Sequence, residues 1–191
     1  MRVAALLLSV VALLPASAHA QIRAQLPAAP AAPPWDTGIQ PIGRDSYWNA
    51  IECGKQGGSR PACVFYDADL CKNGDFALTL FTPYKMVSYE VWQTVRRNEP
   101  APTPDYSAAQ RTRVTLGITP VKGSHNPITA LTIKRDGRVV KPATQSVDTA
   151  GGRFIFDFAA FAPTSEITIE MIGRTGTRTC IVAPEVLKTL R

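Results

Sequence analysis

The stretch that decides the fold is ITALTIKRDGRVV, residues 128–140, in which two short runs flank the dipeptide Asp136-Gly137. This dipeptide readily adopts the positive φ angles of a tight two-residue turn, so the stretch predicts a β-hairpin. Segments on either side alternate apolar and polar residues, with Val114, Leu116 and Ile118 in one of them. The same alternation recurs at 165–173 and after Gly151-Gly152, and FALTLF at 76–81 resembles one more strand. Alternation of this kind predicts half-buried strands.

Five or six short strands beyond Arg111, with no helical pattern between them, predict a mainly β domain. We expect an antiparallel β-sandwich or a partial barrel. The layout resembles an immunoglobulin-like sandwich in its strand-rich C-terminal half and its possible cross-domain disulfide. The Cys, Trp, Cys spacing of true immunoglobulin domains is absent, because Trp92 falls in a predicted helix.

That helix is predicted over 83–97. Thr82 can cap the first turn and Pro83 suits the first helical position. Read with a period of 3.6 residues, an apolar stripe appears that we expect to pack on one face of the sheet, made of Tyr84, Val87, Val91, Trp92 and Val95. Lys85 and other polar residues occupy the opposite side. A second, short helix is predicted at the C-terminal APEVLKTLR, and a weaker pattern indicates a helix from Asp45 to Cys53.

The first 20 residues carry one Arg, an apolar run from Val3 to Leu14 and a small-residue end, which predicts a signal peptide and an exported, periplasmic or extracellular protein. Residues 21–43 are rich in Ala and Pro and predict a flexible spacer. Residues 44–191 have the length of one domain. The net charge is +6, and because the basic residues are scattered we expect no nucleic-acid surface. The apolar runs beyond the predicted signal peptide are short, so we expect no membrane span. The oligomeric state stays open.

All four cysteines lie in the part expected to be exported, and their number is even. An oxidising compartment then favours two disulfides, while the spacing lacks the close pairs of a zinc site. Four cysteines allow three connectivities, among which we favour Cys53 with Cys63 and Cys71 with Cys180.

Motifs that carry chemistry are sparse. Beyond the predicted signal peptide the sequence has a single histidine, His125, in the polar loop KGSHNP, and it lacks the common nucleophile, phosphate-binding and zinc-protease motifs. We therefore expect no catalytic residue, no metal and no cofactor. DADLCKNGD, residues 67–75, offers carboxylates for calcium, but its spacing favours a turn before a strand. The acidic residues of the strand region single out no facing pair for sugar hydrolysis.

Four residues are candidates for contact with a partner: Met86, Tyr89, Trp92 and His125. The first three lie on or beside the predicted helix stripe, and edge aromatics of this kind more often cover a sheet margin. Our leading hypothesis is an exported, non-enzymatic domain that binds a protein or an envelope component. The alternatives are a secreted carbohydrate-active or hydrolytic protein that uses carboxylates, and a secreted inhibitor.

Overall fold

The computed structural model describes residues 38–191 except 69 and 72, so the predicted signal peptide and most of the predicted spacer lie outside the described residues. Two helices and one strand come first: α1 (Arg44–Lys55), β1 (Phe76–Phe81) and α2 (Pro83–Arg96). Seven strands and two short helical segments follow: β2 (Arg113–Pro120), β3 (Ile128–Arg135), β4 (Arg138–Val140), β5 (Thr144–Asp148), β6 (Gly151–Asp157), η1 (Phe158–Phe161), β7 (Ile167–Gly173), β8 (Thr177–Val182) and α3 (Pro184–Thr189).

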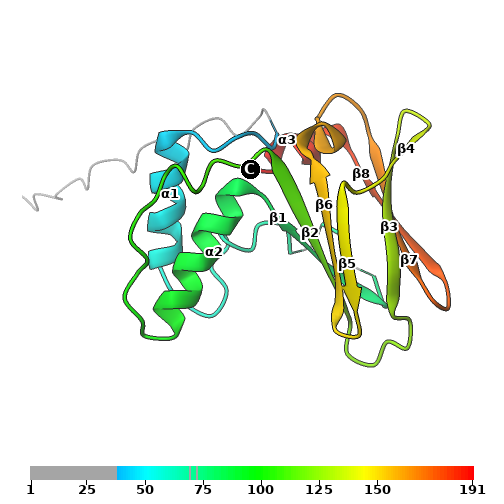
Figure 1. Ribbon diagram of the computed structural model, residues 1–191, viewed down its shortest axis with the longest axis horizontal. Helices are drawn as coiled ribbons and strands as arrows, with labels where there is room; N and C mark the ends of the chain where they lie inside the picture. Colours follow the sequence, from blue (N-terminus) through cyan, green and yellow to red (C-terminus); the bar gives the residue numbers. More distant parts are fainter. Residues whose placement is uncertain (1–37, 69, 72) are drawn as a thin grey trace, which may run out of the picture. The chain divides into compact units, whose positions relative to one another are not determined.

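The strands form two four-stranded antiparallel sheets, which confirms the prediction of a mainly β, antiparallel domain (Figure 1). The order is β1-β2-β6-β5 in the first, here called sheet A, and β4-β3-β7-β8 in the second, sheet B. Neither sheet closes on itself. Both contribute to one hydrophobic core, with Leu116 and Phe154 from sheet A and Leu131 and Ile169 from sheet B. The alternating residues of each strand therefore send one set of side chains into this core and leave the other set on the outer faces.

The predicted hairpin at 128–140 is present. Asp136 and Gly137 have φ angles of 48° and 72°, and Lys134 pairs with Val139 across the two strands. Positive φ at both central residues matches the twist of the flanking strands, which is why this dipeptide sets the register.

Helix α2 begins where its sequence predicts, because the Thr82 side chain accepts a hydrogen bond from Lys85 N at 3.1 Å. The expectation that its valine stripe packs on a sheet was wrong. Val91 is buried against Tyr47 and Ile51 of α1 instead. The helices approach closely because position 54 is glycine, where a Cβ would lie 2.6 Å from Cβ of Val91.

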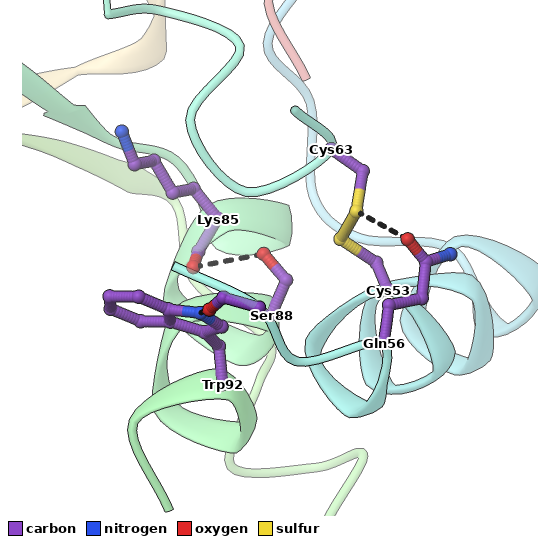
Figure 2. Close-up of a disulfide and its surroundings, with 7 residues drawn as sticks. Cys53, Gln56, Cys63, Lys85, Ser88 and Trp92 are labelled. Atoms are coloured by element: carbon purple, nitrogen blue, oxygen red, sulfur yellow. Dashed lines mark hydrogen bonds between the residues drawn. A yellow bond between two sulfur atoms is a disulfide. The ribbon is translucent and has the colours of Figure 1, made fainter. Parts of the chain in front are cut away.

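Two disulfides join Cys53 to Cys63 and Cys71 to Cys180, which confirms the favoured connectivity and is compatible with an exported protein. Figure 2 shows the first one linking α1 to the following loop, beside Ser88 and Trp92 of α2. The second bridge joins the segment before β1, in sheet A, to β8, in sheet B.

Residues just before α1, which the composition assigned to the spacer, belong to the packed domain. Gly38 N donates to Lys188 O at 3.2 Å. Ile39 is buried in the core between the sheets, and Ile42 is buried in the cluster between α1 and α2. Two isoleucines in a stretch dominated by Ala and Pro thus anchor the chain before residue 44. Among the described residues, no helix has the length and apolar character needed to cross a membrane.

Candidate functional site

A hollow of about 430 Å³ lies on the outer face of sheet A, at the end formed by the turn between β5 and β6. We call it the Gly117 hollow. Its lining combines one aromatic ring, one guanidinium, one carboxylate, two hydroxyls and several glycines. The residues that line it are Phe81, Gly117, Ile118, Thr119, Ser146, Asp148, Ala150, Gly151, Gly152 and Arg153.

Strand register creates this hollow. Gly117 on β2 lies opposite Thr79 on β1 and opposite Arg153 on β6, so the three positions form one row across the outer face. Arg153 in turn lies opposite Ser146 on β5. Since Gly117 has no side chain, the row is interrupted at its centre. The Phe81 ring leans into the gap, with its Cε2 atom 3.2 Å from the position that a Cβ at residue 117 would occupy.

Arg153 brings a positive charge to this hollow. Its side chain is exposed, and the guanidinium makes neither an ion pair nor a hydrogen bond with the residues that the structure describes. Asp148 also lines the hollow, but its Oδ1 accepts hydrogen bonds from Ala150 N at 2.7 Å and Gly151 N at 3.0 Å. One carboxylate oxygen of Asp148 is thus occupied by the turn before β6. The hollow therefore offers donors from Arg153, an acceptor from Asp148, and hydroxyls that can do either.

The Phe81 wall is held from behind by α2. The Tyr89 ring meets the Phe81 ring edge-on, with centroids 5.7 Å apart. Lys85 Nζ also lies 5.7 Å from the centroid of Phe81. Edge-to-face pairs and cation–π contacts both favour one ring orientation, so the helix fixes the position of the wall.

A buried ion pair lies beneath the same helix. The Lys85 ammonium donates to Oδ1 of Asp67, and both side chains are only 1% exposed. Oδ2 of Asp67 accepts from Leu80 N at 2.6 Å, which ties the pair to β1. Burial lowers the pKa of Lys85, and the neighbouring Asp67 carboxylate opposes this shift. The placement of Lys85 on the exposed side of the helix was therefore wrong, because α2 buries two faces: one against α1 and one against the aromatic residues around β1.

A lysine with a lowered pKa and a carboxylate partner can mark a catalytic site as well as a structural one. Here the ammonium points at a carboxylate and three aromatic rings, with its Nζ 5.8, 5.7 and 5.7 Å from the centroids of Phe65, Tyr66 and Phe81. At 1% exposure the ammonium offers no surface to a substrate. We therefore assign the pair to positioning α2 against β1.

Polar groups continue from this pair to the C-terminal segment. The hydroxyls of Tyr66 and Thr82 lie 2.8 Å apart, and both donate to the backbone oxygen of Arg191. Burial raises the pKa of Tyr66 well above its ordinary value, mainly through desolvation. Leu187 and Leu190 are buried in the core that the two sheets share, so the predicted short helix α3 anchors this segment in the domain.

The four partner-binding candidates occupy different surroundings. Trp92 is 5% exposed, stacks edge-on with Phe65 at 4.8 Å and donates from Nε1 to Gly58 O at 3.0 Å. Met86 lines a smaller hollow of about 170 Å³ between α2 and the segment 102–111. His125 is exposed in the loop between β2 and β3. Of the four, Tyr89 alone contacts the wall of the Gly117 hollow.

The acidic residues considered for calcium or hydrolysis are also dispersed. Asp157 pairs with Arg113 at 3.0 Å on sheet A, while Glu170 pairs with Lys134 at 2.8 Å on sheet B. Asp67 forms an ion pair with Lys85, and Asp75 pairs with Arg178 at 2.8 Å. The turn before β1 is held by Asn73, whose side chain accepts from Phe76 N at 2.8 Å, in agreement with the turn favoured for this stretch.

Sequence reasoning missed the Gly117 hollow. One signal was present: an isolated glycine inside an alternating strand often marks a position where another group approaches closely. Comparisons of this chain with protein-family models, curated proteins and solved structures find no match.

Proposed function

We propose that the protein is an exported, non-enzymatic domain that binds an envelope component at the Gly117 hollow. The observation that carries this proposal is the combination of the Arg153 guanidinium, which has no ionic partner among the described residues, with an aromatic wall over a glycine floor. Binding sites characteristically combine a shaped apolar surface with a few polar groups that orient the ligand.

The surroundings support binding because the hollow is built on paired strands. Gly117 and Arg153 lie on β2 and β6, the two central strands of sheet A, and α2 backs the Phe81 wall. Groups on rigid elements keep their geometry without a ligand, which lowers the entropy cost of association. The two disulfides support the exported location. A sandwich of immunoglobulin-like layout is part of the proposal, supported by the core that the two sheets share.

The test is binding of the purified protein to a fractionated envelope preparation, in which polysaccharide and protein fractions are immobilised separately. The wild-type chain is compared with Gly117→Val, which fills the floor of the hollow with a residue that strands accept well. We expect binding to one fraction that Gly117→Val reduces at least tenfold.

Gly176→Val is the matched control, because it makes the same change in the turn between β7 and β8 of sheet B, where a Cβ meets nothing within 4 Å. It should bind as the wild type does. Equal binding by the wild type and a folded Gly117→Val variant would contradict the proposal, as would robust turnover of any envelope substrate.

A further inference from the structure

We propose that the Gly117 hollow recognises a sugar that carries a carboxylate group. This inference rests on the proposed function and names the class of envelope component. It follows from three features of the hollow: the cation, the carboxylate beside it, and the shape of the wall and floor.

Arg153 supplies the recognition of the acid group. A guanidinium is planar and presents paired N–H donors that match the two oxygens of a carboxylate. Arg153 is exposed, and its guanidinium has no anionic partner within the described part of the chain. Its neighbours in the row are Gly117 and Ser146, neither of which competes with a ligand as an anion.

Asp148 decides between an acidic sugar and a simple oxyanion. It lies opposite Gly151, two residues along β5 from Ser146, and so occupies the position diagonal to Arg153. Diagonal neighbours in an antiparallel pair are about 7 Å apart. Any anion on Arg153, whether a phosphate or a sugar carboxylate, meets the Asp148 carboxylate as a like charge. A sugar ring can place its carboxylate on Arg153 and donate from a hydroxyl across the ring to Asp148, so it satisfies both groups.

Phe81 and Gly117 match the remaining faces of a sugar. A pyranose presents apolar C–H groups on its ring faces and hydroxyls around its edge. The Phe81 ring, fixed by Tyr89, offers an apolar wall, and the hydroxyls of Thr119 and Ser146 stand around the hollow. The missing side chain at Gly117 leaves room for the edge of the Phe81 ring, so wall and floor meet without a step.

The test uses titration of the full chain against a panel of acidic oligosaccharides, each paired with its carboxyl-reduced counterpart, and against inorganic phosphate. We expect at least one acidic oligosaccharide to bind at least tenfold more tightly than its reduced form. Arg153→Ala should weaken this binding roughly 10- to 100-fold, the usual range for a charge-assisted pair of hydrogen bonds. Arg153→Lys should recover only part of the loss, because it restores the charge without the planar fork.

Arg138→Ala is the matched control, since it removes the same charge from an exposed position on β4 of sheet B. It should leave the affinity unchanged. Equal binding of acidic and reduced oligosaccharides that still depends on Gly117 would overturn this inference and leave the proposed function intact. Binding of phosphate but of no oligosaccharide would also overturn the inference. So would a panel on which nothing binds, while an envelope fraction still binds through Gly117. If neither an envelope fraction nor an oligosaccharide binds in a way that depends on Gly117, this inference and the proposed function are both overturned.

Discussion

Phe81 at the end of β1 leans over Gly117 of β2, with ring carbon Cε2 3.2 Å from the place where a Cβ at residue 117 would be. The two residues are diagonal neighbours on the outer face of sheet A, since Phe81 lies opposite Thr115. A side chain at 117 would displace the ring, and a ring without support would close the gap. The hollow therefore depends on both the absent side chain and the helix that holds the ring.

Removing the Tyr89 ring, which supports Phe81 from behind, should weaken ligand binding although Tyr89 does not line the hollow. Tyr89→Ala deletes the edge-on contact with Phe81, which is worth about 0.5–1.5 kcal/mol beyond buried area. We expect a loss of affinity for the envelope fraction of about tenfold at most, corresponding to roughly 1.4 kcal/mol. Met86→Ala, on the same helix but lining a different hollow, should leave the affinity unchanged. Equal losses in both variants would show that Tyr89 has no special relation to the hollow.

The helix pair should not tolerate a methyl group at residue 54. A Cβ there would lie 2.5 Å from Ser88 O and 2.6 Å from Cβ of Val91, so α1 and α2 must separate. We expect Gly54→Ala to lower the free energy of unfolding by about 1–3 kcal/mol, the usual cost of overpacking, although alanine favours helices. Urea denaturation measures this change. Gly176→Ala, with nothing within 4 Å of its Cβ, should change stability by less than about 0.5 kcal/mol.

Breaking the buried ion pair should be costly. Asp67→Asn keeps an oxygen for Leu80 N but leaves the Lys85 ammonium buried without a counter-ion. We expect a loss of about 3–5 kcal/mol in chemical denaturation. The double variant Asp67→Asn with Lys85→Met should lose less than the single one, because it removes the orphaned charge.

An exposed pair provides the comparison. Glu99→Gln breaks the contact of 3.0 Å with Arg97, in which both side chains are more than half exposed, and should cost less than about 1 kcal/mol. A similar small loss for Asp67→Asn would mean that Lys85 in the variant either reaches water or loses its proton, so that no buried charge is left unpaired.

Stability should fall in alkali. Burial raises the pKa of Tyr66 and of Tyr84 above their ordinary value of 10.0, so the folded protein holds these protons at a pH where the unfolded chain releases them. The free energy of unfolding therefore decreases as the pH rises above about 10, by at most about 1.4 kcal/mol per pH unit for each tyrosine. Burial lowers the pKa of Lys85, so its contribution increases with pH but ends near its ordinary value of 10.5.

Tyr66→Phe isolates the first of these tyrosines. Its free energy of unfolding, measured in urea at several pH values above about 10.5, should fall less steeply than that of the wild type. Parallel slopes for the two proteins would show that the Tyr66 hydroxyl titrates normally in the folded state.

The two disulfides should contribute unequally to the free energy of unfolding. The Cys71–Cys180 bridge spans 109 residues, whereas the Cys53–Cys63 bridge spans 10. In the chain-entropy model, closing these loops is worth about 4.7 and about 3 kcal/mol respectively. Replacing both cysteines of the long loop with alanine should therefore destabilise the protein more than replacing both of the short loop, as measured by denaturation without reductant. The reverse order would indicate that native packing around the helix pair dominates.

Sequence alone determined the local elements of this protein. Alternation identified the strands around Val114, Ile133 and Ile169, and Asp136-Gly137 specified their sharpest turn, because side-chain period and backbone φ preference are properties of neighbouring residues. The ends of α2 followed from Thr82 and Pro83 for the same reason. The even number of cysteines indicated two bridges, and the favoured pairing was confirmed.

Only the tertiary structure decided which surfaces meet. The partner of α2 is α1, the partner of Lys85 is Asp67, and the hollow joins Phe81, Gly117 and Arg153 from three strands. Each of these contacts depends on strand register and on close approach at glycine, which bring together residues far apart in the chain. Spacing along the sequence carries no record of such distances, so the candidate site became visible only in the folded chain.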